Sequence, residues 1–374
     1  MPRGIKMNLF EEQRLVDVCS YLRSGKTITA SEISTHGEYP VFGGNGCRGY
    51  TTHYNFSGDC AIIGRQGAFC GNVRYFTGNA YMTEHAIIAC ANNKNNTRYL
   101  SYLLSTMNLG RLSGQSAQPG LSVKYLSNVK IFIPSLNIQK KIVSVLSLLD
   151  DKIKLNNKIN DNLQQQAFAL FEQLLLTADD GECSVADIAH LNPKRALAKN
   201  QEAKCIEMSQ LSTSGAFPSG WEKRPFNGGM RFSNGDTLLA RITPCLENGK
   251  AAFIDFLDTS EVAFGSTEYI VLAPKGEIPP EFLYCLARYP VFSDYAVKNM
   301  NGSSGRQRVS AETIGQFKLP RPSTNELKRF GNVVSSLFLK MRFNSLENMR
   351  LSSLRDSLLP KLMSGELDVS ELDI

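Results

Sequence analysis

Two stretches of the chain carry apolar residues at three- and four-residue steps. In the first stretch, which follows Pro134, these positions are Ile138, Ile142, Val145, Leu149, Ile153, Ile159, Leu163, Leu170 and Leu174. In the second they are Phe330, Val333, Leu337, Met341, Leu351, Leu354, Leu358 and Leu362. This spacing predicts two helices of about 40 residues, each roughly 60 Å long at 1.5 Å per residue. Because their apolar stripes match, we expect the two helices to pack together as a coiled coil.

The two helical stretches are copies of one another. A constant shift of 188 residues (322 − 134) aligns Ser122–Leu174 with Ser310–Leu362 without a gap and places Pro134 on Pro322. The same shift relates the predicted pairing positions, which are Ile142, Leu149, Asn156 and Leu163 in the first helix and Phe330, Leu337, Asn344 and Leu351 in the second. The chain therefore contains an internal repeat, which we expect to be pseudo-twofold.

An amide interrupts both apolar stripes at the same place, Asn156 in one helix and Asn344 in the other. A buried asparagine at such a position costs stability but penalises shifted pairings. The alternative is that both amides face water, because Lys154, Asn157 and Lys158 make this stretch polar all round. An antiparallel pairing, which we favour, puts the preceding domains at opposite ends of the helix pair, whereas a parallel pairing puts them side by side.

A globular stretch with a weaker internal echo precedes each helix. Val16-Asp17-Val18 resembles Ala186-Asp187-Ile188 at a shift of 170 residues (187 − 17), and Gly58-Asp59 resembles Gly235-Asp236 at a shift of 177 (235 − 58). Glycine-rich turns between short apolar runs predict strands in both stretches. We therefore predict an α+β fold in five parts: a mixed α/β domain at 1–134, a helix at 135–176, a linker at 177–182, a second mixed domain at 183–322, and a helix with a tail at 323–374.

Composition narrows the class of protein. The chain has 374 residues, of which 42% are hydrophobic and 20% charged, which is typical of globular domains. A net charge of +6 is compatible with a polyanionic partner without indicating one by itself. Nine cysteines without a CxxC pair and four histidines without zinc-ligand spacing predict reduced, mostly buried thiols and no metal site. We expect a cytoplasmic protein, because we find neither an apolar run near the ~20 residues of a membrane span nor an apolar signal core.

An arginine follows a predicted strand at matching places in both globular stretches, Arg65 after Cys60–Ile63 and Arg241 after Thr237–Ala240. Guanidinium groups paired with guanine are the commonest specific contact in the major groove, and Gln or Asn suits adenine. For either arginine alone, a structural ion pair is the alternative, and the surrounding loops could equally be solvated turns. With these two arginines, the predicted DNA-contacting residues are Gly44, Asn45, Arg48, Gln66, Asn72, Gln115 and Gln118 in the first stretch and Arg231, Thr243, Asn248, Lys250, Arg306, Gln307 and Arg308 in the second.

The catalytic motifs that we sought are incomplete. Ser24-Gly25-Lys26-Thr27 ends like a Walker A loop, but Ser20 stands where the motif needs its first glycine. Asp236 with Glu247-Asn248-Gly249-Lys250 partly resembles the carboxylate cluster of a metal-dependent nuclease, with the lysine one residue too far from the glutamate. Asn192-Pro193-Lys194 lacks the second proline and the aromatic residue of an amino-methyltransferase motif. The sequence therefore predicts a non-catalytic chain without a cofactor of its own.

Taken together, these features resemble the specificity (S) subunit of type I restriction-modification systems. The resemblance is carried by Leu121–Ile153 with Phe168 and Phe171, by Leu358–Leu367, and by the glycine-containing segments Gly43–Val73 and Gly235–Glu268. It implies two target recognition domains, each of which reads half of a gapped, asymmetric sequence in double-stranded DNA, with the helix pair fixing the gap.

The resemblance also implies partners. Two methyltransferase (M) subunits, which bring S-adenosylmethionine, dock on such a chain, and restriction (R) subunits with nuclease and translocase activity can join. The second helix departs from the family pattern in Leu319–Pro322 and Leu327–Arg329, where a Glu-Gln pair is more usual. Two other classes stay open at this point, a coiled-coil scaffold that never reads DNA and a free-standing nuclease.

Overall fold

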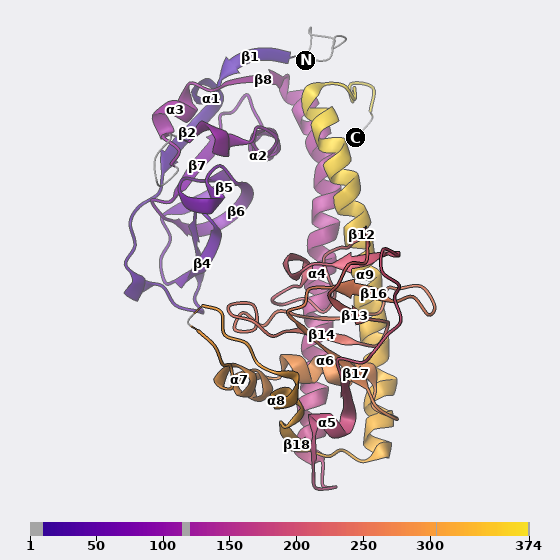
Figure 1. The fold of residues 1–374 in the computed structure, drawn as a ribbon. Helices are drawn as coiled ribbons and strands as arrows, with labels where there is room; N and C mark the ends of the chain where they lie inside the picture. The colour runs from indigo at the N-terminus through magenta and orange to yellow at the C-terminus, as the bar shows by residue number, and fades with distance from the viewer. Residues whose placement is uncertain (1–9, 114–119, 304, 373–374) are drawn as a thin grey trace. The chain divides into compact units, whose positions relative to one another are not determined.

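The protein is described by a computed structural model that covers residues 10–113, 120–303 and 305–372 (Figure 1). The chain forms two compact units. Unit 1 comprises 1–151 and 352–374, and unit 2 comprises 152–351. The boundary between the units therefore falls inside both long helices, α4 (Leu136–Thr177) and α9 (Thr324–Ser364).

Each unit contains a two-stranded antiparallel ladder that leads into a long helix. In unit 1 the ladder and its short helices are β1 (Phe10–Arg14), β8 (Lys130–Pro134), α1 (Leu15–Val18) and α3 (Val123–Ser127). In unit 2 they are β9 (Glu182–Ser184), β18 (Lys318–Pro320), α5 (Val185–Ile188) and α8 (Ala311–Gly315). Arg14 faces Lys130 as Ser184 faces Lys318, which reproduces the two sequence shifts and confirms the internal repeat.

The central sheet of unit 1 has six strands in the order β2-β7-β5-β6-β3-β4. They are β2 (Cys19–Ser24), β3 (Tyr39–Gly43), β4 (Gly46–Thr51), β5 (Phe56–Gly64), β6 (Val73–Met82) and β7 (Ala86–Ala91). Helix α2 (Thr97–Thr106) starts where the Asn96 side chain accepts the N–H of Tyr99, and it packs on β5 and β6. The core beneath this sheet contains mostly aliphatic side chains, among them Ile63, Leu100, Leu104 and Leu146.

Unit 2 has two four-stranded sheets. The first, in the order β10-β17-β14-β15, consists of β10 (Ala189–Leu191), β14 (Thr237–Ala240), β15 (Ala251–Phe253) and β17 (Tyr269–Pro274). The second, in the order β12-β11-β16-β13, consists of β11 (Glu202–Ile206), β12 (Glu222–Pro225), β13 (Met230–Phe232) and β16 (Ala263–Gly265). The first sheet repeats the order β2-β7-β5-β6 of unit 1, so the two units share a four-stranded core.

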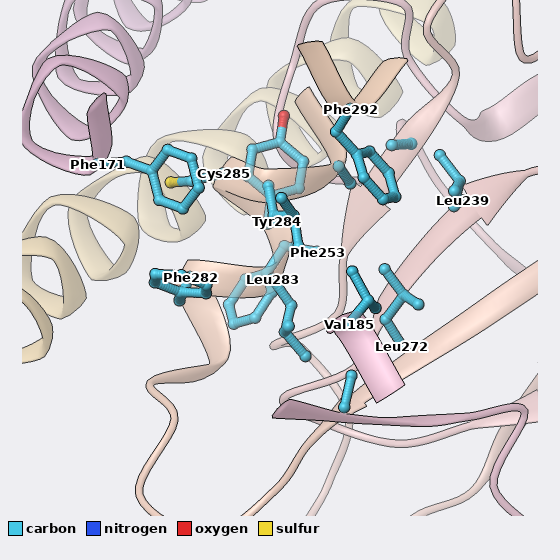
Figure 2. Close-up of a cluster of buried hydrophobic side chains, with 14 of the residues drawn as sticks. Phe171, Val185, Leu239, Phe253, Leu272, Phe282, Leu283, Tyr284, Cys285 and Phe292 are labelled. Atoms are coloured by element: carbon cyan, nitrogen blue, oxygen red, sulfur yellow. The ribbon is translucent and has the colours of Figure 1, made fainter. Parts of the chain in front are cut away.

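Helices α6 (Pro280–Arg288) and α7 (Pro290–Lys298) complete the core of unit 2. Figure 2 shows how Phe171 of α4, Phe282 and Tyr284 of α6, and Phe292 of α7 converge with residues of the first sheet. Several rings meet edge to face, for example Phe171 and Phe282 at a centroid distance of 4.9 Å. Such pairs stabilise a core beyond the area that they bury.

Helices α4 and α9 are antiparallel. In unit 2, Phe171 near the end of α4 meets Phe330 near the start of α9, and in unit 1 Ile142 shares a core with Leu362. Leu163 and Leu337 pack partly buried against the core of unit 2, whereas Leu149 and Leu351 are half-buried. Helix α9 passes through Pro360 and ends at Ser364, followed by Gly365 with φ 74°. The antiparallel coiled-coil prediction is thus confirmed.

The two amides in the helix stripes are buried, with Asn156 1% and Asn344 2% exposed. Nδ2 of Asn156 donates to Glu347 at 2.7 Å and to Asn348 at 2.9 Å, and Nδ2 of Asn344 donates to Asn160 at 2.8 Å. The alternative that both amides face water is therefore wrong, because partners on the opposite helix satisfy them. Their role in setting the register stays a prediction.

All nine cysteines are free, but only four of them are buried, and Cys47 is exposed, so the expectation of mostly buried thiols is only partly met. Within the described ranges, no helix is both long and apolar enough to cross a membrane.

Candidate nucleic-acid interface

Arg65 and Arg241 occupy the same place in the two units. The N–H of Arg65 donates to the carbonyl of His85 (2.9 Å), and its carbonyl accepts the N–H of Leu121 (2.8 Å). The N–H of Arg241 donates to the carbonyl of Glu268 (3.0 Å), and its carbonyl accepts the N–H of Val309 (3.0 Å). Leu121 and Val309 are again 188 residues apart (309 − 121), so the four-stranded core and the repeated segment hold both arginines in one frame.

Neither guanidinium forms a salt bridge with any residue that the structure describes. Nη1 of Arg65 donates to the carbonyl of Glu84 at 3.2 Å, and Nε of Arg241 is buried without a hydrogen-bond partner. The structural ion pair that was the alternative for these arginines is therefore not observed. A buried donor without a partner costs stability, and a ligand that supplies an acceptor would remove that cost.

The β3–β4 hairpin of unit 1 lies next to Arg65. A Cβ atom on Gly44 would lie 3.3 Å from the carbonyl oxygens of Gln66 and His85, so only glycine allows this approach without displacement of the backbone. The Arg48 side chain lies against Gly43 at the base of the same hairpin. The structure thus brings the predicted residues Gly44, Asn45, Arg48, Arg65 and Gln66 together.

Sequence reasoning missed three polar residues beside Arg65. Nδ1 of His85 lies 3.0 Å from Oε1 of Gln66, and its Nε2 lies 3.1 Å from Oε1 of Glu84. The guanidinium of Arg74, on β6, lies against Gly46 at the hairpin tip. These residues come from different strands, so their proximity leaves no signal in local spacing. Asn72 contributes through its backbone, whose carbonyl accepts the N–H of Gly64 at 2.8 Å.

In unit 2 the loop before α8 pairs with the segment after Arg241. The N–H of Thr243 donates to the carbonyl of Gln307 at 3.0 Å, and Ile242 forms an isolated bridge with Arg308. The predicted residues Arg241, Thr243, Gln307 and Arg308 therefore lie together, with Arg306 exposed on the same loop.

Other predicted residues of unit 2 lie elsewhere or are held by other groups. Arg308 forms a forked ion pair with Glu268 at 2.7 Å, and Nζ of Lys250 donates to the carbonyl of Met208 at 2.7 Å. Asn248 is exposed in the turn before β15. Arg231 lies on β13 of the second sheet, over the ring of Phe226. Gln115 and Gln118 of the first stretch lie outside the described residues.

Asp236, the centre of the nuclease alternative, is 1% exposed, and both of its oxygens accept from Nη2 of Arg195 at 2.5 and 2.7 Å. Burial raises its pKa, against the opposing effects of the Ser233 N–H and of Arg195. The described residues contain no group of three or more His, Cys, Asp or Glu side chains that could hold a metal ion.

Comparisons with known proteins agree with this geometry. The family model of the type I restriction modification DNA specificity domain matches residues 7–165. The EcoprrI specificity subunit of Escherichia coli is 41% identical over 133 residues, which are 34% of this chain and 33% of that protein. The HindI specificity subunit of Haemophilus influenzae is 25% identical over 332 residues, 67% of this chain and 71% of that protein. The chain belongs to the type I restriction enzyme specificity subunits.

The fold of this specificity subunit has a solved counterpart. The S subunit of a type I restriction-modification system from M. genitalium matches it with a TM-score of 0.61 and 18% identity over 97% of both chains. The match to the EcoprrI subunit spans about a third of that protein's length. The predicted recognition of the family and its fold class are thereby confirmed.

Proposed function

We propose that this chain is the DNA sequence-specificity subunit of a type I restriction-modification complex and that each unit reads one half of a gapped target in double-stranded DNA. The observation that carries this proposal is the recurrence of Arg65 and Arg241 in one backbone frame, without ion-pair partners among the described residues. A guanidinium that is held by its backbone and free at its tip suits bidentate readout of a guanine.

The surroundings of the two arginines differ, which supports an asymmetric target. Arg65 lies beside Gln66, His85 and the glycine-rich hairpin, whereas Arg241 lies beside Glu268 and the loop of Arg306. Different donors and acceptors at the same place select different bases. The two half-sites are therefore unrelated in sequence.

The helix pair sets the gap between the half-sites. A helix of 42 residues is roughly 60 Å long, which corresponds to about one to two turns of DNA at ~34 Å each. The buried amides Asn156 and Asn344 favour a single pairing register, and a fixed register gives a fixed gap.

The chain itself is non-catalytic in this proposal and acts in the cytoplasm. Two methyltransferase subunits, which carry S-adenosylmethionine, dock on it, and restriction subunits join where the host encodes them. The family membership and the two repeated ladders, which offer two similar docking surfaces, support this arrangement.

The deciding experiment maps adenine methylation across the genome of the source organism with and without this chain. We expect methylation to disappear at one gapped, two-part motif while all other marks stay intact. An unchanged map, in cells that express the chain and an active partner methyltransferase, would instead support a coiled-coil scaffold that does not read DNA.

A further inference from the structure

The ion pair between Glu268 and Arg308 lies directly beside Arg241. Nε of Arg308 donates to both oxygens of Glu268 at 3.0 and 2.9 Å, and its Nη2 donates to Oε1 at 2.7 Å. Nη1 of Arg308 donates to the carbonyl of Arg306 at 3.1 Å. Every nitrogen of this guanidinium therefore already has a partner within its own loop or on Glu268.

The backbone fixes both members of the pair. Glu268 ends the short connection from β16 to β17, and its carbonyl accepts the N–H of Arg241. Arg308 bridges to Ile242 on one side and to Asn301 on the other. The Glu268 carboxylate is thus held on one residue and oriented by another, which is the arrangement of a preorganised contact.

The carboxylate keeps accepting capacity. Oε1 of Glu268 receives two of the hydrogen bonds from Arg308 and Oε2 receives one, and each carboxylate oxygen can accept about two. The side chain is 25% exposed. Hydrogen bonds from Arg308 lower the pKa of Glu268, with the charges of Arg308 and Arg241 acting in the same direction, so Glu268 is ionised at neutral pH.

The equivalent place in unit 1 has different chemistry. There His85 supplies the carbonyl that binds the arginine N–H, and Gly120 occupies the place of Arg308 in the bridge to the following residue. The ion pair is therefore a property of unit 2 and not of the repeated frame.

We propose that Glu268 is a specificity-determining residue of unit 2 that accepts a hydrogen bond from a base amino group, cytosine N4 or adenine N6, next to the base that Arg241 contacts. Arg308 is its positioning residue and does not contact DNA. A carboxylate repels the acceptor-only edges of guanine and of thymine, so it rejects these bases as well as selecting amino groups. This inference rests on the proposed function.

The test is the methylation map of the source organism carrying Glu268→Gln. We expect one position of the unit 2 half-site to relax, with previously rejected bases accepted roughly ten- to a hundredfold more often, while the other half-site is unchanged. Retained methylation at the wild-type site reports that the variant folds. Should Glu268→Gln leave no methylation at all, the milder Glu268→Asp is mapped in its place, with relaxation at the same position expected.

Arg308→Met and Arg306→Met form a matched pair, because both remove one positive charge from the same loop and only Arg308 contacts Glu268. We expect Arg308→Met to relax the same position as Glu268→Gln and Arg306→Met to leave the motif unchanged. A motif that stays unrelaxed in Glu268→Gln, or a relaxation that Arg306→Met reproduces, overturns the inference. If the wild-type chain directs no motif at all, the proposed function itself has failed.

Discussion

The two units share a frame and differ in what fills it. Both have the same ladder, the same order of four sheet strands and the same backbone contacts at the arginine. Beyond that frame, unit 1 extends its sheet by β3 and β4, whereas unit 2 adds a second sheet. The comparison indicates that the frame fixes where the chain presents a readout side chain, and that the added strands are free to decide what surrounds it.

The attachment of each unit to the helix pair differs as well. In unit 1, charged groups connect α2 to both helices: Arg98 pairs with Asp151 at 2.9 Å, and Asp150 accepts from Tyr102 and from Arg355. In unit 2, aromatic rings do this, with Phe338 of α9 against Phe253 and Tyr284. Ion pairs weaken with salt whereas ring packing does not, so the two attachments should respond differently to the same change.

The largest expected effect is that of Phe171→Ala in unit 2. Phe171 is 1% exposed and contacts three other rings, so its truncation should cost about 3–5 kcal/mol of unfolding free energy. Hydrogen exchange should rise in unit 2 and not in the sheet of unit 1. The control Leu176→Ala, at a residue that is 86% exposed, should change stability by less than about 0.5 kcal/mol. Equal loss of protection in both units would mean that they do not have separate cores.

Arg65→Ala and Arg241→Ala test whether the shared frame presents a reader in each unit. Each substitution should relax one half-site and cost roughly 1–3 kcal/mol of discrimination, the range for one bidentate base contact. The measurement is the methylated motif of each variant. A motif that is identical to the wild type in both variants would remove the two arginines from the interface.

Asp150→Asn tests the polar attachment of unit 1. Asp150 is 26% exposed and accepts from two donors, so we expect a loss of about 1–3 kcal/mol in urea unfolding. The neighbouring Asp151→Asn is the matched control, because Asp151 is 62% exposed and has Arg98 as its ion-pair partner; it should cost at most about 1 kcal/mol. Indistinguishable losses would contradict the idea that burial gives Asp150 its weight.

The smallest effect is expected for Lys152→Met. Lys152 pairs with Glu347 at 3.3 Å on an exposed face of the helix pair, and Glu347 keeps its hydrogen bond from Asn156. The change should stay between about 0.2 and 1 kcal/mol. A larger loss of thermal stability would show that this polar stretch depends on charge rather than on the buried amides.

The sequence was sufficient for the helices, because a three- and four-residue apolar period repeated twice is a signal that extends over many residues. It also identified Arg65 and Arg241, because the repeat placed them in register. It left Asn156 undecided, since its neighbours on α4 are polar and its partners Glu347 and Asn348 lie on the other helix.

The readout surroundings could not be predicted in the same way. The contacts of His85 with Gln66 and of Glu268 with Arg308 join residues from different strands. Such pairs depend on strand order and register, which the alternation of apolar and polar residues does not specify. Arg308 shows the consequence, because in the sequence it looked as free to bind DNA as Arg306.

Unit 1 is assembled from segments that the ribosome makes at different times. Val369 is buried in its core, and the carbonyl of Ser370 accepts from Lys141 at 2.7 Å. Because the whole of unit 2, residues 152–351, is translated in between, unit 1 waits on the order of 10–40 s at ~5–20 residues per second. During that time its apolar surface for α9 is uncovered, so the half that is translated first is completed last and depends most on chaperones.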